Sequence, residues 1–434
     1  MNQDPAMPSP APAVRMPRRR WWRRFALGSA ITLVVLLCIH LIWYVTARAD
    51  LVQARAASAA AGLTEDPAQV IPPPCAEADN AAPRYQRAYG LLTLGGEPYV
   101  PGRSAGRLDP RIDALLGRMV GKGIESLIVS DGAAVLALLD HEDFRRAWKL
   151  VAEGARLPRC RFDNDWSVGP ALMLPQLDML RHFGRLGSLR ARLLATQGRA
   201  QEAADQFADL LWMARQYGEE PIFLTLLCGQ GMESDVLDNL RQTLEQPAFA
   251  AVDLQRVQLA LSARPRAAEW KRALQGEFAL FGCKAFHDPP TFQIDQLLAL
   301  SNGESPAFWW FYASWLGAPL RANDEAAYHR WFAAKYHAPQ SPAPDLGANW
   351  RHSLTEWLVR GLNLLHDAQD IASERTDAAL LALHAASGGT PMTTATLDVE
   401  RDEKGGWIIS HKVKPGRTDY QQKKLQPWHI PSHP

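Results

Sequence analysis

The chain has no cluster of lysine and arginine outside its first 24 residues. Its 434 residues carry 47 basic and 46 acidic side chains. Six of the arginines precede the first long apolar run: Arg15, Arg18, Arg19, Arg20, Arg23 and Arg24. A nucleic-acid-binding protein needs clustered positive charge to displace counterions from phosphates. We therefore expect no nucleic-acid partner.

Signatures of catalysis and cofactor binding are also missing. No GxSxG elbow occurs, and no GxGxxG follows a predicted strand. The segment 117–123 has one residue too few between its glycines for a phosphate loop, and Arg145 stands where an HExxH motif starting at His141 needs its second histidine. The sequence therefore leaves any catalytic residues unknown and predicts no cofactor.

The five cysteines are too widely spaced for a structural zinc site or a CxxC redox motif. Cys38 lies in the apolar run. Cys75, Cys160, Cys228 and Cys283 remain, enough for one or two disulfides in an oxidising compartment. We expect no metal site.

We interpret several notable acidic side chains as structural rather than catalytic. Residues 163–167 alternate oxygen-bearing side chains as a calcium loop does, but they lack its glycine and its closing glutamate. We interpret them as caps of turns. Glu219 and Glu220 are expected to cap the start of a helix, and Glu233 and Asp235 to lie on a solvated face.

The longest apolar run predicts a transmembrane helix. Phe25–Val45 contains His40 as its only readily ionisable side chain, and as a helix it would be about 31 Å long. This length matches the roughly 30 Å hydrocarbon core of a bilayer. Pairs of aromatic residues at 21–22 and 43–44 mark both interfaces. We expect His40 to reach the interface rather than to relay protons.

Charge asymmetry predicts the orientation of this helix. Arginines crowd the N-terminal side, while only Arg48 and Arg55 follow closely. By the positive-inside rule the N-terminus is cytoplasmic and the bulk of the chain is extracytoplasmic, anchored in a bacterial inner membrane. A signal peptide cleaved at Ala47–Ala49 is the alternative, but the apolar run exceeds a signal sequence's usual 7–15 residues.

The rest of the chain is predicted to be mainly α-helical. The expected divisions are a basic head at 1–24, the transmembrane helix at 25–45, a stalk or linker at 46–78, a helical extracytoplasmic domain at 79–390, and a β-hairpin with a tail at 391–434. The alanine-rich stretch 49–61 is expected to prolong the helix until Gly62. The hairpin is predicted from strands at 394–400 and 407–412.

One helical pair stands out within the domain. Ser188–Gly218 has two helical patterns hinged at Gly198 and resembles a single tetratricopeptide-type repeat. No second copy follows 34 residues later. We therefore expect an α-helical bundle or an irregular helical solenoid.

The aromatic segment 306–319 has three interpretations. Its rings are too close together for all of them to face one core, since successive helical residues point about 100° apart. We interpret it first as a buried core element. The alternative is a membrane-surface or partner-docking patch, and the third option is a carbohydrate-stacking site. The candidate docking residues are Trp309, Trp310, Tyr312 and Trp315.

Two segments, EADNAAPRYQRAYGLL and PRCRFDNDWSVGPALMLPQLDMLRHFGRL, followed by GEEPIFLTLLCGQG, resemble uncharacterised bacterial single-pass membrane proteins with a helical extracytoplasmic domain. The likeness covers residues 79–245 and implies architecture and location only. Two functions follow as expectations. The first is a membrane-anchored interaction or scaffold protein that has the lipid bilayer and an envelope protein as partners. The alternative is an anchored hydrolase of an envelope polymer.

Overall fold

The computed structural model describes residues 18–94, 107–246, 249, 252–262, 266–287, 306–338, 353–412 and 425–432. Within these ranges the protein is mainly helical with one small sheet, which confirms the predicted fold class. The elements in chain order are α1 (Arg18–Ala60), α2 (Pro67–Val70), η1 (Glu77–Asp79), α3 (Ala82–Gly90), α4 (Pro110–Leu139), α5 (Glu142–Ala155), η3 (Trp166–Ala171), α6 (Gln176–Thr196), α7 (Ala200–Tyr217), α8 (Phe223–Leu244), α9 (Gln255–Ser262), α10 (Arg266–Gly276), the π-helical turn η5 (Glu277–Gly282), α11 (Cys283–His287), α13 (Pro306–Ala313), α14 (Ala318–His337), α15 (Ser353–Ala386), β1 (Leu397–Arg401), β2 (Trp407–His411) and β3 (Trp428–Ile430).

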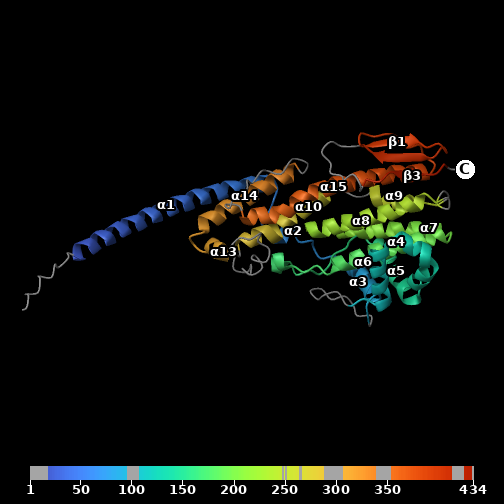
Figure 1. Ribbon diagram of the computed structural model, residues 1–434, viewed down its shortest axis with the longest axis horizontal. Helices are drawn as coiled ribbons and strands as arrows, with labels where there is room; N and C mark the ends of the chain where they lie inside the picture. Colours follow the sequence, from blue (N-terminus) through green and yellow to red (C-terminus); the bar gives the residue numbers. More distant parts are fainter. Residues whose placement is uncertain are drawn as a thin grey trace, which may run out of the picture.

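Helix α1 is a single helix of 43 residues whose first half projects from the rest of the protein (Figure 1). The part Trp22–Ala60 reaches a mean hydropathy of 2.5 in its most apolar stretch, and none of that stretch is buried. Among the described residues it is the one helix long and apolar enough to cross a membrane. The predicted apolar N-terminal helix is therefore confirmed.

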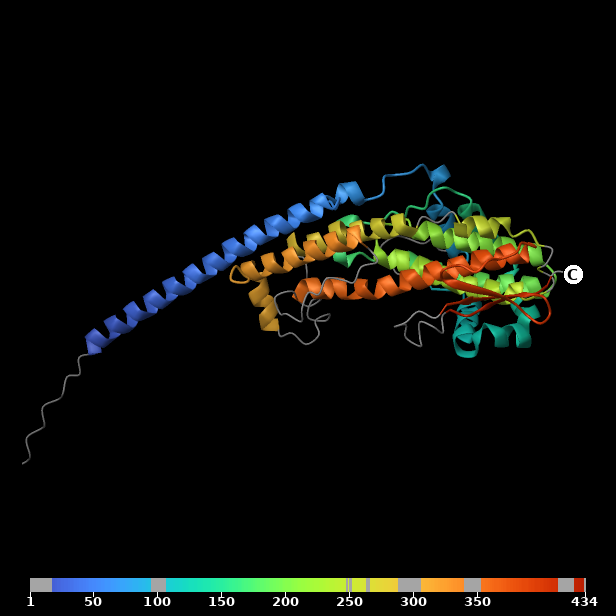
Figure 2. The same ribbon diagram turned by 90° about the horizontal axis from the view of Figure 1, so that it is seen from above.

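The second half of α1 lies along α14 (Figure 2). Ala47, Leu51 and Ala54 are buried against Ala322 and Ala326. Small side chains on both surfaces let the two helix axes approach closely. The segment predicted as a stalk thus begins as a helix packed against the domain.

Helix α1 ends just before Gly62, whose φ of +91° favours glycine. The short helix α2 follows, and Asp66 caps it by accepting a hydrogen bond from the amide of Ala68 at 3.0 Å. From there residues 71–76 run in an extended path to η1 and α3, the blue trace in Figure 2. We call residues 69–76 the strap.

Two large hydrophobic clusters form the core of the domain. The distal cluster contains side chains from helices α3 through α9, from the second half of α15 and from the sheet. The proximal cluster joins α10, η5, α11 and α14 around Phe278, Tyr328 and Trp331. Helices α8 and α15 contribute side chains to both clusters, so they connect the two halves of the domain.

Helices α6 and α7 form the predicted helical hairpin. Gly198, between them, has a φ of +78°. A Cβ atom on Gly187 would lie 2.8 Å from a methyl carbon of Leu210, so the close packing of the pair requires a glycine there.

The predicted C-terminal hairpin is confirmed, and a third strand extends it. Strand β1 pairs antiparallel with β2, with Val399 opposite Ile409, and β2 pairs antiparallel with β3. The third strand lies in the segment predicted only as a tail, and Trp428 and Ile430 of β3 are buried in the distal cluster. Their burial against α15 and α8 holds this strand in a defined position.

Candidate functional site

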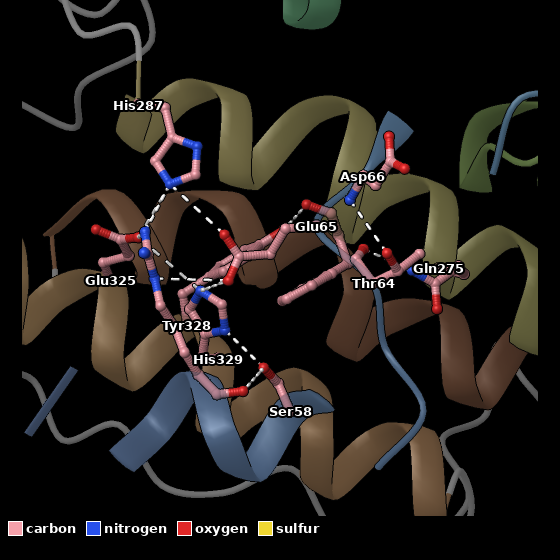
Figure 3. Close-up of polar contacts among 11 residues, drawn as sticks. Ser58, Thr64, Glu65, Asp66, Gln275, His287, Glu325, Tyr328 and His329 are labelled. Atoms are coloured by element: carbon pink, nitrogen blue, oxygen red, sulfur yellow. Dashed lines mark hydrogen bonds and ion pairs between the residues drawn. The ribbon is translucent and has the colours of Figure 1, made fainter. Parts of the chain in front are cut away.

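A group of polar side chains gathers where the end of α1, helix α11 and helix α14 meet (Figure 3). Arg55 and Ser58 lie one turn apart on α1, and Glu325 and His329 lie one turn apart on α14. Glu65, from the segment after α1, completes this face. We call Arg55, Ser58, Glu65, Cys283, His287, Glu325 and His329 the junction cluster.

Glu325 is the centre of the charged contacts. The Nη2 atom of Arg55 lies 2.5 Å from its Oε1, and Nε2 of His287 lies 3.4 Å from the same oxygen. Burial opposes ionisation of this carboxyl, but hydrogen bonds from His287 and Arg55 outweigh it and lower the pKa of Glu325. The pKa of His287 is raised, mainly by its hydrogen bond to Glu325.

His329 is fully buried, with 0% of its surface exposed. Its Nδ1 lies 2.7 Å from Oγ of Ser58, and that hydroxyl lies 2.9 Å from the carbonyl oxygen of Arg55. A hydroxyl has one proton to donate. In the tautomer that satisfies both contacts, Ser58 donates to the carbonyl and Nδ1 of His329 donates to Ser58, and Nε2 then has a lone pair. Burial lowers the pKa of His329 to about 4, so the ring is neutral at pH 7.

Three possible ligand atoms surround one point in the junction cluster. Nε2 of His329 lies 3.8 Å from Oε1 of Glu65. The sulfur of Cys283, a carboxylate oxygen of Glu65 and a nitrogen of His329 all lie within 4.8 Å of one another. Burial raises the pKa of the Cys283 thiol well above its ordinary value. None of these residues was predicted as a site residue. They are far apart in the sequence, as Ser58 and His329, which are separated by 271 positions, illustrate, so no local motif contains them.

A cavity of about 770 Å³ lies beneath the strap. Apolar groups from the strap, Trp166 and Tyr336 line part of it. Four cationic side chains also line it: Arg159, Arg161, Lys271 and Arg272. Among the described residues, no acidic side chain lies within ion-pair distance of these four. Cys75 and Cys160 also face the cavity, and all five cysteines of the chain are free thiols.

Glu220 lies in the wall of this cavity and is 3% exposed. Burial raises the pKa of Glu220 to about 7, although Gln176 and Asn164 hydrogen-bond to it. Its Oε1 accepts a hydrogen bond from Nδ2 of Asn164 at 3.0 Å. The capping role expected for Glu220 is wrong, because α8 starts only at Phe223 and has no side-chain cap.

The predictions for two other acidic residues have opposite outcomes. Glu233 was expected on a solvated face, but it is buried, pairs with Arg266 and accepts a hydrogen bond from Thr376 at 2.8 Å. Asp165 is a turn cap as predicted, since it accepts a hydrogen bond from the amide of Ser167 at 3.0 Å.

The aromatic segment divides between core and surface. Tyr312 is buried and donates a hydrogen bond to Oδ2 of Asp324 at 2.8 Å, so it belongs to the core and not to an exposed patch. Trp315 is 63% exposed, and Phe311 and Leu316 are exposed beside it. The side chains of Trp309 and Trp310 lie outside the described part of the chain.

Comparison of the chain with protein-family models, with curated proteins and with solved structures gives no match in any of the three. The likeness of α6 and α7 to a tetratricopeptide repeat, and of residues 79–245 to bacterial single-pass proteins, therefore stays a prediction.

Proposed function

We propose that this protein is an extracytoplasmic interaction module anchored in the bacterial inner membrane by α1. The apolar stretch of α1 supports the anchor, and the arginines before it support a cytoplasmic N-terminus. The helical domain then lies outside the cytoplasm.

The observation that carries this proposal is the continuity of α1. The helix passes from its apolar half into the domain without a break, and Leu51 and Ala54 are buried against α14. A domain joined in this way keeps a fixed position relative to the bilayer. Fixed placement suits a module that presents a binding surface to other envelope components.

The cavity beneath the strap is the binding surface that the charges favour. Its four cationic side chains are lined up against three acidic ones, Asp79, Glu219 and Glu220, and burial raises the pKa of Glu220 to about 7. Apolar walls next to this excess of positive charge suit an extended polypeptide segment with acidic side chains. We propose such a segment of an envelope protein as the partner.

Site-specific photo-crosslinking in living cells tests this proposal. A photoreactive amino acid at Gln69, which lines the cavity, should give a discrete protein adduct, and the same amino acid at Met392, which is 75% exposed, should not. Lys271→Glu should remove the adduct, whereas the matched charge reversal Lys404→Glu in the β1–β2 turn should leave it unchanged. Equal adducts at both positions, or an adduct insensitive to Lys271→Glu, would contradict the proposal.

A hydrolase is the second candidate, and one observation favours it. Glu220 holds a proton near neutral pH in a cavity wall that also contains Trp166, as a general acid would. If the domain cleaves an envelope glycan, Glu220→Gln should abolish cleavage while leaving the fold intact. The same rate in wild type and Glu220→Gln would remove this candidate.

A further inference from the structure

We propose that Glu65, Cys283 and His329 form a binding site for a divalent transition-metal ion, best suited to Zn²⁺, at the junction of α1 with the domain. Carboxylate oxygen, cysteine sulfur and imidazole nitrogen are the ligands that zinc takes in proteins. The three ligand atoms lie within 4.8 Å of one another. Zinc–ligand bonds of about 2.0–2.3 Å in a tetrahedron place ligand atoms about 3.3–3.8 Å apart. The separation of 3.8 Å between Nε2 of His329 and Oε1 of Glu65 exceeds the about 3.3–3.5 Å of a nitrogen and an oxygen on one zinc ion, so a small inward movement of the Glu65 side chain completes the arrangement.

His329 supplies an independent observation. Its Nε2 is buried and has no hydrogen-bond partner among the described residues. In the tautomer with the proton on Nδ1, Nε2 carries a lone pair and faces two carboxylates, Glu325 at 3.9 Å and Glu65 at 3.8 Å. A lone pair facing carboxylate oxygens is repelled by them, and a cation between them converts this repulsion into attraction.

Ser58 also provides the support that metal-binding histidines usually have. A ligating imidazole donates its other N–H to an oxygen, which fixes the tautomer and the orientation of the ring. In the junction cluster this oxygen is Oγ of Ser58, 2.7 Å from Nδ1 of His329. The donor atoms and their supporting hydrogen bond therefore come together on three separate segments of the chain.

The charge around the site also favours a cation. Two carboxylates, Glu65 and Glu325, face one guanidinium, Arg55, and the imidazole of His287, so they carry one excess negative charge whenever His287 is neutral. Arg55 lies closer to Glu325, at 2.5 Å, than to Glu65, at 3.5 Å. Nε2 of His287 lies 3.7 Å from the second oxygen of Glu65, but it already contacts Glu325 at 3.4 Å and Nη2 of Arg55 at 2.6 Å. A water molecule therefore completes the proposed coordination.

Metal titration of the full chain in detergent tests the site. After chelator treatment, one Zn²⁺ per chain should bind in competition with a chromogenic chelator. Co²⁺ should bind in its place and give a thiolate-to-cobalt charge-transfer absorption. Cys283→Ser should abolish this absorption and weaken Zn²⁺ binding roughly 100-fold or more, since loss of a supporting residue alone costs 10- to 100-fold. Cys228→Ser, a matched change at the partly buried thiol of α8, should alter neither.

Two further variants guard against misfolding of Cys283→Ser. Glu65 is one-third exposed, so Glu65→Gln should fold and should still weaken Zn²⁺ binding roughly 100-fold. Ser58→Ala should keep the charge-transfer absorption but weaken binding roughly 10- to 100-fold. Failure of the wild type to bind one ion, or binding that neither Glu65→Gln nor Cys283→Ser weakens, would overturn the proposal and leave the cluster as an ion-pair network between helices.

Discussion

The imidazole ring of His40 meets the indole ring of Trp315 edge-on, with the ring centroids 5.0 Å apart. His40 lies near the outer end of the apolar stretch of α1, and Trp315 lies in the turn between α13 and α14. The contact therefore places this turn beside the C-terminal end of the apolar stretch of α1. Trp315, Phe311 and Leu316 are exposed there, and in the proposed membrane orientation they lie at the headgroup region of the bilayer.

Position 315 should therefore touch lipid. A photoreactive amino acid in place of Trp315 should crosslink to phospholipid when the full chain is in lipid nanodiscs. The same amino acid at Met392, which is exposed beyond α15, should not. Mass spectrometry of the adducts checks the prediction. Equal lipid labelling at the two positions would show that the turn does not lie at the membrane surface.

Tyr312 and Trp315 should respond differently to substitution, although they lie only three positions apart. Tyr312→Phe removes the hydrogen bond to the buried carboxylate of Asp324 and should lower the free energy of unfolding by about 2 kcal/mol. Trp315→Ala changes an exposed side chain and should cost about 0.5 kcal/mol or less. Denaturant unfolding of both variants in the same detergent gives the comparison, and a larger cost for Trp315→Ala would contradict the division into core and surface.

The packing of α1 on α14 should tolerate no larger side chain. Ala326 is 0% exposed against α1, so Ala326→Leu should destabilise this contact by about 1–3 kcal/mol. Trypsin should then cleave α1 at Arg48 and Arg55 roughly tenfold faster, because cleavage follows the population of the detached helix. Ala334→Leu on the exposed face of α14 is the matched control and should leave cleavage unchanged. The same rate in all three proteins would mean that α1 is not held by α14.

Glu220 should make the domain less stable as the pH rises. Its pKa is about 7 in the folded protein, against an ordinary value of 4.5. Below pH 4.5 the carboxyl is protonated in both states and has no effect on stability. Between pH 4.5 and 7 the unfolded chain releases the proton first, so the free energy of unfolding falls, by about 3 kcal/mol in total above pH 7.

Denaturant unfolding at pH 5 and pH 8 measures this effect. Glu220→Gln keeps an oxygen for Asn164 but has no proton to lose, so the difference in stability between the two pH values should be smaller in this variant by up to about 3 kcal/mol. An identical pH dependence in both proteins would show that Glu220 ionises normally in the fold.

The elements with a strong local signal could be predicted from the sequence. The apolar run predicted the long apolar helix α1, Gly198 predicted the break between α6 and α7, and alternation over 394–400 and 407–412 predicted the first two strands. Strand β3 was missed because three residues carry too little periodicity, and its order depends on the burial of Trp428 and Ile430. This burial depends on tertiary contacts, which local sequence patterns do not show.

The junction cluster could not be predicted for a similar reason. His329 and Glu65 belong to segments far apart in the chain, and neither has a ligand at motif spacing. The pairing of α1 with α14 brings them together, and the alanines that permit it give no functional signal. Glu220 was misjudged because acidic residues before a helix usually cap it, whereas here burial beneath the strap dominates.

The orientation of α1 is the central claim, and protease accessibility in spheroplasts tests it most directly. The full chain carries one epitope tag at each end, and protease is added outside the cells. We expect the C-terminal tag to be lost and the N-terminal tag, with a fragment containing α1, to stay protected in carbonate-washed membranes. A protected C-terminal tag, or a soluble domain beginning near Asp50, would contradict the account: the first would reverse the orientation, and the second would make the apolar helix a cleaved signal sequence.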